Sequence, residues 1–344
     1  MDPLQFFAAS RLVIVAGKGG VGKTTVTAVL ARAAADSGMR VLVVDVEGRA
    51  GLAGMLGGAP GDVFGYDEVP IVSGLGLLGA GSITGRTILP ADALRDYLVT
   101  HGLGRLSGRL GTGGVLEVVS TAAPGIDDIL VLGKVKHLEL TAGYDLILLD
   151  GPAAGHAITF LQAAAGLLDS VRVGPIQAQA AEVAEMLADS TRCQVILVTL
   201  AEPTPANEAV ETAFTLEDRI GVALGPVVVN GLYPHRPLLS FARRRSGKST
   251  EKPGSVAPVG SVAPVAPVDS TGPVAPVDSS DDVLSAAAEF RIRRCLAQSA
   301  QLASLSERLP LLHLRLPFVF TAGLTLDDVI ELAAIMIDRI RDLP

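Results

Sequence analysis

The segment Gly-Lys-Gly-Gly-Val-Gly-Lys-Thr-Thr, at residues 17–25, constrains the fold more than any other part of the chain. It follows an apolar run at 12–16 and opens a helix-like stretch at 23–37. A strand, a glycine-rich loop and a helix N-terminus in this order place backbone N–H groups around a phosphate. The segment therefore predicts ATP binding by Gly17, Lys18, Gly19, Gly20, Val21, Gly22, Lys23, Thr24 and Thr25. Lys23 is expected at the β and γ phosphates and the Thr24 hydroxyl on Mg²⁺.

Apolar runs rich in β-branched residues recur along the chain and predict strands at 12–16, 41–46, 115–120, 145–150, 194–200, 226–230 and 311–316. Helix-like stretches lie between several of them, including 176–190 and 204–220, where Thr204 and Pro205 fit the cap and first-turn positions. Strands that alternate with helices predict an α/β fold, here a P-loop NTPase with a mostly parallel central sheet flanked by helices. A composition of 49% hydrophobic and 4% aromatic residues suits such buried strands.

The predicted organisation is a single ATPase domain over residues 1–344, with a helical subdomain inserted. Residues 85–141 are expected to form that mainly helical insertion, with 175–190 as a second candidate segment; ordinary crossover helices are the alternative. Residues 246–282 are rich in Pro, Val, Ala and Ser and predict a disordered linker. Residues 283–344 are expected to complete the ATPase core as helix, strand and a terminal amphipathic helix.

Acidic residues follow two of the predicted strands. Asp45 ends one, with Glu47 two positions later, and Asp150 ends another. Carboxylates at the carboxyl ends of parallel strands point into the same crevice. Together with Thr24 they predict a Mg²⁺ site formed by Thr24, Asp45 and Asp150, although isolated strand-end acids also serve as turn or cap residues.

Charge and composition exclude several classes. A net charge of −8 argues against a sequence-independent nucleic-acid binder, and the one basic run, at 243–248, is expected to flank a solvated loop. The first ten residues do not resemble a secretion signal and no apolar stretch reaches membrane-spanning length, so a cytoplasmic location is expected. Cys193 and Cys295 form no metal-ligand pair in sequence and are expected to be small buried or partly buried residues.

Five segments together resemble the ArsA family, the arsenite-pump and tail-anchored-protein targeting ATPases of the deviant Walker A class. They are the loop at 17–25, residues 45–49 as switch I, residues 150–156 as switch II, Asn230, and Pro317 with Phe318. The chain is especially similar to an actinobacterial branch in which switch I carries Glu-Gly-Arg in place of Asp-Pro-Ala.

The resemblance implies a Mg²⁺-dependent ATP hydrolase that works as a nucleotide-driven dimeric switch. Lys18 would reach the partner's nucleotide, while Lys23, Asp45 and Glu47 would act in catalysis, Glu47 in place of an aspartate that orients the attacking water. Gly155 would sense the γ-phosphate. The base would be bound by Asn230, with Pro317 and Phe318 nearby. Hydrolysis would move the helical subdomain to bind or release a protein client or to drive a membrane partner.

The chain also departs from the family. It lacks the Cys-x-x-Cys pair of the zinc-bridged targeting enzymes, and it carries one phosphate loop where the pump ATPase has two. Two subunits must therefore supply the two sites, as a homodimer or as a heterodimer with a paralogous ATPase. Two alternatives stay open: a weakly or non-hydrolysing subunit of such a heterodimer, and a partition-type ATPase that positions cargo.

Overall fold

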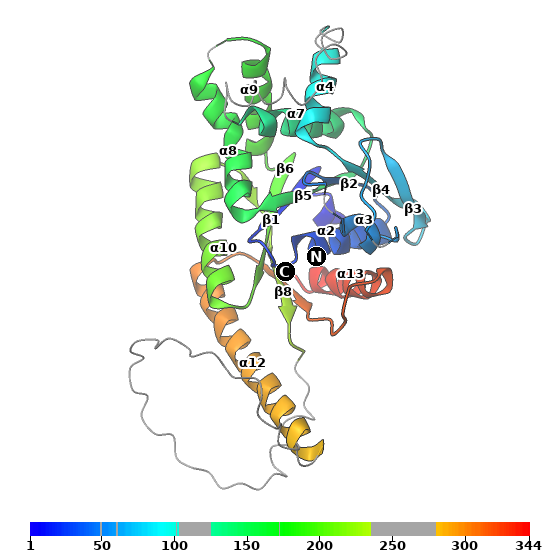
Figure 1. Cartoon of the computed structure of the whole chain (residues 1–344), viewed down its shortest axis with the longest axis vertical. Helices are drawn as coiled ribbons and strands as arrows, with labels where there is room; N and C mark the ends of the chain where they lie inside the picture. The colour runs from blue at the N-terminus through cyan, green and yellow to red at the C-terminus, as the bar shows by residue number, and fades with distance from the viewer. Residues whose placement is uncertain (49, 60, 101, 103–124, 172, 235–279) are drawn as a thin grey trace, which may run out of the picture. The chain divides into compact units, whose positions relative to one another are not determined.

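A central sheet organises the chain (Figure 1). The computed structural model describes residues 1–344 except 49, 60, 101, 103–124, 172 and 235–279. Among the described residues the sheet has nine strands, in the order β3-β4-β2-β5-β1-β6-β8-β9, with β7 paired to β6. Only β3 runs antiparallel to its neighbour, so the predicted mostly parallel α/β fold is confirmed. The strands are β1 Leu12–Gly17, β2 Arg40–Asp45, β3 Val69–Leu75, β4 Gly81–Thr87, β5 Leu146–Ala153, β6 Cys193–Leu200, β7 Ala223–Leu224, β8 Val227–Leu232 and β9 His313–Pro317.

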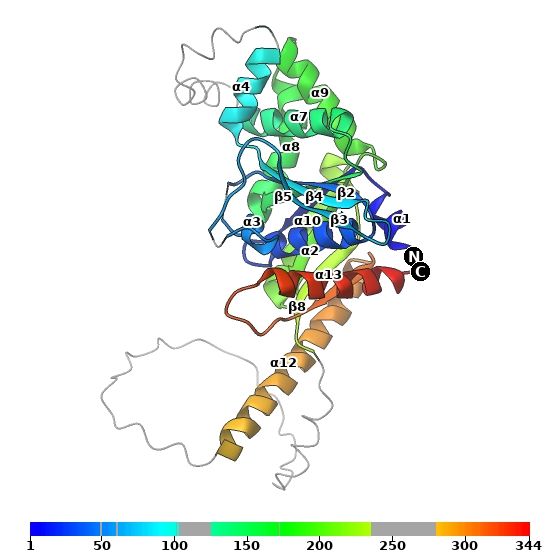
Figure 2. The same cartoon turned by 90° about the vertical axis from the view of Figure 1, so that its right-hand side faces the viewer.

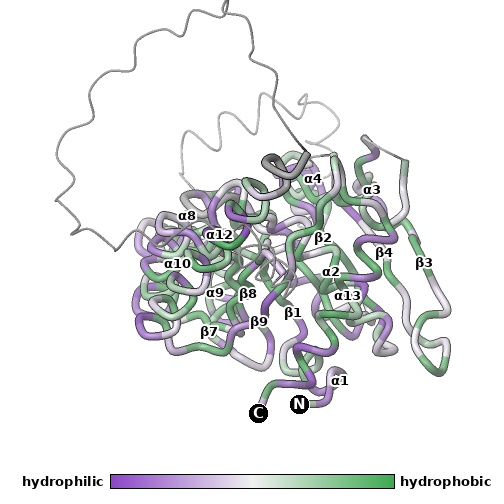
Figure 3. Tube along the Cα trace, turned by 90° about the horizontal axis from the view of Figure 1, so that it is seen from below, coloured by the Kyte–Doolittle hydropathy of each residue, from purple (hydrophilic) through white to green (hydrophobic). Residues whose placement is uncertain are grey.

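Alternate residues of each inner strand enter two separate cores. In β1, Leu12, Ile14 and Ala16 belong to one cluster of buried side chains, whereas Val13 and Val15 belong to the other. This two-residue period follows from the pleat. Because both faces are covered, the inner strands β1, β2, β5, β6 and β8 are mostly hydrophobic, and green stretches are seen among the strands in Figure 3.

Helices cover the two faces unequally (Figures 1 and 2). One face packs against α1 Pro3–Phe7, α2 Lys23–Asp36, α3 Leu52–Met55 and α13 Leu326–Arg341. The other packs against a thicker helical layer, made of α4 Pro90–Thr100, α7 Ile126–Thr141, α8 Ala154–Ser170, α9 Pro175–Ala188 and α10 Pro203–Thr215. The helices α4, α7, α8 and α9 also contact one another.

The structure corrects three local predictions. β3 and β4 were not predicted, and β4 places residues 85–87 in the sheet rather than in the helical insertion. Helix α10 begins two residues earlier than expected, with Glu202 as its N-cap and Pro203 in its first position, and a π-helical turn at Leu216–Ile220 follows it. Strand β5 runs past Asp150 to Ala153.

Several other predictions lie outside the described residues: the strand at 115–120, the basic run at 243–248, and residues 246–279 of the linker. Residues 280–282 begin α12 Ser280–Arg308. The described chain forms two compact units, Met1–Leu232 with Gln298–Pro344, and Tyr233–Ala297. The division into subdomain and linker otherwise stays a prediction.

The predicted terminal helix is present as α13. Thr325 caps it in a reciprocal capping box with Asp328, and its buried face comprises Val329, Leu332, Ala333, Met336 and Ile340. Within the described ranges of the chain, none of the helices combines the length and the apolar character needed to cross a membrane.

Candidate nucleotide-binding site

The glycine-rich loop connects β1, which ends at Gly17, to α2, which begins at Lys23. Gly22 is the residue before the helix and has left-handed backbone angles, φ 89° and ψ 35°. No side chain caps the helix there, and its first turn carries no acidic residue. The first backbone N–H groups of α2 therefore remain available to an anion at the positive end of the helix dipole.

Asn230 braces this loop from β8. Its side-chain Nδ2 donates to the carbonyl oxygen of Val21 at 2.9 Å, and its Oδ1 accepts from the N–H of Gly231 at 2.9 Å. A Cβ placed on Gly22 would lie 2.3 Å from Asn230 Nδ2. Glycine at position 22 is therefore required both by its backbone angles and by the close approach of Asn230. The adenine contact expected of Asn230 stays a prediction.

Two carboxylates meet below the loop. β2 and β5 are neighbours in parallel register, with Asp45 paired to Asp150, and the two side chains are 4% and 8% exposed. The hydroxyls of Thr24 and Thr27 both donate to Asp150, at 2.8 and 3.0 Å. Asp45 and Asp150 thus lie at the same edge of the sheet, as expected.

Burial dominates the ionisation of Asp150. It raises the pKa of that carboxyl to about 6; the nearby charge of Asp45 adds to this, while the two threonine hydrogen bonds and Lys23 oppose it. A buried pair of carboxylates is stabilised when a cation lies beside it. The donor set of two carboxylates and the Thr24 hydroxyl fits Mg²⁺, which keeps several waters and phosphate oxygens in its own shell.

Asp45 also ties switch I to the neighbouring strand. Its Oδ1 accepts from the backbone N–H of Glu47 at 2.9 Å, and its Oδ2 lies 3.5 Å from the Thr87 hydroxyl at the end of β4. Its carbonyl oxygen accepts from the N–H of Ile88 at 2.8 Å. Across the described residues, no group of three or more His, Cys, Asp and Glu side chains is arranged to hold a metal ion, so a metal here would need Thr24 and nucleotide oxygens as well.

The two loop lysines differ in their surroundings. Lys23 opens α2 and its charge acts on Asp150. Lys18 forms an ion pair with Glu208 on α10, and each of these side chains is 37% exposed. Its ammonium is therefore directed toward its own chain in this structure.

The remaining predicted residues lie on elements around the loop. Gly155 is in the first turn of α8, directly after β5. Pro317 ends β9 and pairs with Leu232 of β8, and Phe318, which is 40% exposed, donates its N–H to the Leu232 carbonyl at 2.8 Å. Asn230 lies on β8, and Phe318 directly follows β9, the strand paired with β8. Their base-binding role stays a prediction.

Three residues of this site were not predicted from the sequence: Thr27, Thr87 and Glu208. Thr27 follows Thr24 by three residues and so lies on the same helix face, which is a signal that spacing could have given. Thr87 and Glu208 belong to the site only through the pairing of β4 with β2 and the docking of α10.

Known protein families match two parts of the chain. The family described as "CobQ/CobB/MinD/ParA nucleotide binding domain" matches residues 12–93, and the family described as "Anion-transporting ATPase" matches residues 99–173. ATPase BagA of Mycobacterium tuberculosis is 33% identical over 231 residues, which cover 65% of this chain and 66% of that protein.

Other relatives align over shorter shares of their length. ATPase GET3 of Ajellomyces dermatitidis is 32% identical over 154 residues, or 44% of this chain and 42% of that protein. A Halobacterium salinarum protein described as an arsenical pump-driving ATPase is 26% identical over 244 residues, or 65% of this chain and 36% of that protein. The chain thus spans just under two thirds of the mycobacterial relative and about a third to two fifths of the others.

The parallel sheet, the loop at the N-terminus of α2 and the paired carboxylates define a P-loop nucleotide-binding protein. Within that class, the match to the anion-transporting ATPase family and the similarity to these relatives support an ArsA-type ATPase.

Proposed function

We propose that this protein hydrolyses ATP in a Mg²⁺-dependent reaction and uses the reaction as a conformational switch. The observation that carries the proposal is the convergence of Thr24, Asp45 and Asp150 below an uncapped helix N-terminus. The uncapped N–H groups can bind an anion, and the two carboxylates near them can bind a cation. ATP with Mg²⁺ carries both charges in that arrangement.

The loop residues bind and orient the phosphates. Backbone N–H groups of α2 bind the phosphate oxygens, and Lys23 stabilises the charge that develops on the transferred group. Thr24, Asp45 and Asp150 would hold Mg²⁺, which would supply positive charge to neutralise the phosphates. Glu47 orients the attacking water, and Asn230 keeps the loop in position through Val21.

The switch would act through the end of β4. Asp45 contacts Thr87 and Ile88, and α4 begins two residues later at Pro90. Leu89 also lies within 4 Å of the position that a side chain at Gly48 would take. A change in switch I on loss of the γ-phosphate would therefore bear directly on the first helix of the helical layer.

We infer a dimeric active form, in which Lys18 leaves Glu208 and reaches the partner's nucleotide. Each side chain of the ion pair is 37% exposed to water, so the pair contributes at most about 1 kcal/mol and its release costs little. The partner is a second copy or a paralogous subunit, and the helical layer would then bind a protein client or a membrane-protein partner from the cytoplasm.

ATP turnover of single variants tests the proposal. Lys23→Ala should abolish turnover through loss of phosphate binding, and Lys18→Ala should abolish it while leaving ATP binding to the monomer within a few-fold of the original. Arg339→Ala, on the exposed face of α13, is the matched control for loss of a surface cation and should turn over normally. Undiminished turnover in both lysine variants would contradict the assignment.

A weakly hydrolysing subunit of a heterodimer is the second candidate function. Its motive is Glu47, which is one methylene longer than the aspartate expected at that position, so the geometry of the attacking water depends on its reach. Glu47→Asp should raise turnover of the isolated protein if this candidate is correct. Turnover that is already robust in a purified homodimer, and that falls in Glu47→Asp, would exclude it.

A further inference from the structure

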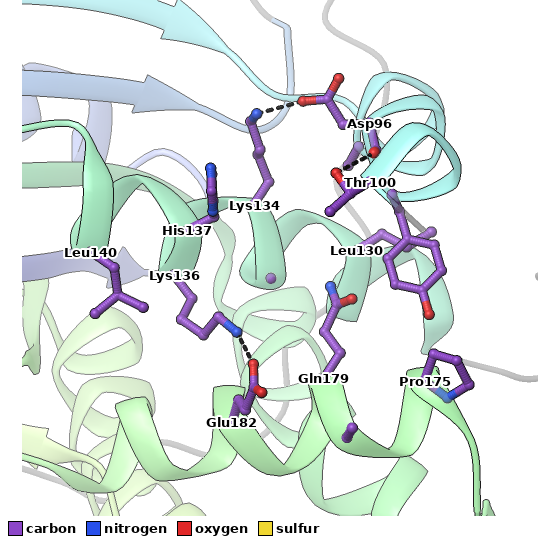
Figure 4. Close-up of a pocket in the computed structure, with 14 residues that line it drawn as sticks. Asp96, Thr100, Leu130, Lys134, Lys136, His137, Leu140, Pro175, Gln179 and Glu182 are labelled. Atoms are coloured by element: carbon purple, nitrogen blue, oxygen red, sulfur yellow. Dashed lines mark hydrogen bonds and ion pairs between the residues drawn. The ribbon is translucent and has the colours of Figure 1, made fainter. Parts of the chain in front are cut away.

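A cavity of about 340 Å³ lies in the helical layer, away from the nucleotide site. The residues that line it belong to α4, α7 and α9, and α7 lies between the other two (Figure 4). Small residues create the space, since Ala93, Gly133 and Ala178 line it from the three helices in turn. Leu130, which is 1% exposed, and the Tyr97 ring supply apolar surface.

Gly133 is needed for this arrangement. A Cβ at position 133 would lie 1.7 Å from the side-chain nitrogen of Gln179 on α9. That nitrogen donates to the carbonyl oxygen of Ile129 at 3.2 Å, which fixes the amide against α7. The cavity is thus bounded by a positioned polar group as well as by apolar side chains.

Two lysines of α7 extend in opposite directions along the cavity, Lys134 toward Asp96 on α4 and Lys136 toward Glu182 on α9 (Figure 4). The lysine side chains are only 18% and 14% exposed, whereas the two carboxylates are 36% and 59% exposed. The cationic groups therefore belong to the wall and the carboxylates to the rim. Lysine can donate hydrogen bonds but cannot accept them, so the wall favours a ligand that carries an acceptor.

The two rim carboxylates can exchange with a ligand. Glu182 is 59% exposed, so water solvates its carboxylate when it leaves Lys136. Asp96 also accepts a hydrogen bond from the Tyr66 hydroxyl, so it stays partnered if Lys134 turns to a bound group. His137, the next residue on α7, also lines the cavity.

We propose that this cavity binds a small amphiphilic monoanion, a carboxylate or sulfonate joined to a compact apolar body. The anionic group would take the ammonium of Lys136 in place of Glu182. The apolar body would lie against Leu130 and Tyr97. This site goes beyond the ATPase function and does not depend on it.

Titration of the full chain with 8-anilinonaphthalene-1-sulfonate, in the absence of nucleotide, tests the site. Ala178 is exposed on α9, so Ala178→Phe fills the cavity with little disturbance of the core and should weaken binding at least about ten-fold. Lys136→Gln should weaken it about five-fold, the effect of losing an ion pair of about 1 kcal/mol. Ala188→Phe, an exposed alanine on the same helix outside the cavity, is the matched control and should bind as the original protein does.

Competition then establishes the ligand class. Decanoate should displace the dye at lower concentration than decanol or decyltrimethylammonium, because only decanoate offers an anion to Lys136. Absence of saturable dye binding, equal binding by Ala178→Phe and Ala188→Phe, or equal displacement by the three competitors would each overturn the proposal. Loss of ATP turnover in Lys23→Ala has no bearing on any of these results.

Discussion

The contact between Gly22 and Asn230 predicts a strong coupling between two substitutions. In Gly22→Ala, the left-handed backbone costs about 1 kcal/mol. The new Cβ would lie 2.3 Å from Asn230 Nδ2, so the amide must move and lose its bonds to Val21 O and from Gly231 N. Each of these bonds contributes about 1 kcal/mol, so Gly22→Ala should destabilise the protein by about 3 kcal/mol.

Asn230→Ala loses the same two hydrogen bonds and should cost about 2 kcal/mol. The double variant then adds only the backbone strain and should cost about 3 kcal/mol, whereas independent effects would add to about 5 kcal/mol. The expected coupling is therefore about 2 kcal/mol. Urea unfolding of the nucleotide-free chain measures it by circular dichroism, since the protein contains no Trp.

Gly20 offers a matched control for this double-mutant cycle of Gly22→Ala and Asn230→Ala. Its φ is also left-handed, at 86°, but a Cβ there would meet nothing within 4 Å. Gly20→Ala should cost about 1 kcal/mol and should be additive with Asn230→Ala. Additivity within about 0.5 kcal/mol in the Gly22 cycle, or equal coupling in both cycles, would refute the assigned role of Asn230.

Three further predictions concern charges and thiols. Glu208→Gln removes the partner of Lys18, so it should raise the ATP-dependent dimer fraction by up to about five-fold in equilibrium sedimentation. The stability of the monomer should change by no more than about 1 kcal/mol. A smaller dimer fraction would contradict the proposal that Lys18 reaches the partner's nucleotide. Burial, aided by Asp127 and opposed by His156, raises the pKa of Asp128 to about 6, so the charged carboxylate destabilises the folded state above that pH. Asp128→Asn should therefore stabilise the protein at pH 8, and this gain should disappear as the pH falls toward 4. Urea unfolding at each pH measures the difference. Burial raises the pKa of the Cys193 thiol to about 12, so a disulfide reagent should modify the half-buried Cys295 first and reach Cys193 only on unfolding, which mass spectrometry would resolve.

Local sequence patterns predict the loop and the proximity of Asp45 and Asp150 because both depend on short-range order. A glycine-rich loop between an apolar strand and a helix allows few arrangements, and acids that follow parallel strands share one edge. The pairing of Asp45 with Asp150 required only that β2 and β5 be neighbours. The same reasoning also places Thr24 beside Asp150, because α2 begins where β1 ends.

The hairpin of β3 and β4 was missed because its glycines lower strand propensity, and only tertiary packing explains them. A Cβ at Gly81 would lie 1.9 Å from the carbonyl oxygen of Ala35, and one at Gly85 would lie 2.5 Å from the Phe64 ring. Because these glycines have no side chain, α2 and the loop before β3 can pack closely against the sheet. No local sequence pattern indicates this packing. The ion pair of Lys18 with Glu208 was hidden for the same reason, since 190 residues separate its partners.

Strand β4, which the sequence did not predict, connects Asp45 to the helical layer through a series of side-chain contacts. Its residue Thr87 contacts Asp45, and the preceding Arg86 is 5% exposed with its guanidinium 4.8 Å from the centre of the Tyr66 ring. The Tyr66 hydroxyl donates to Asp96 of α4. Burial, then this hydrogen bond and the charge of Asp96, raise the pKa of Tyr66 well above its usual value, so the hydroxyl stays a donor at all physiological pH values.

A buried guanidinium cannot be separated from its partners without a large desolvation penalty. Arg86 is held by the Glu68 carboxylate at 3.2 Å as well as by Tyr66, so the end of β4 and the hairpin around it should move as one body. Asp96 connects Tyr66 to α4, and its ion pair with Lys134 connects α4 to α7 and to the wall of the cavity. A displacement of switch I that reaches Thr87 would thus be transmitted to the cavity through these partnered charges.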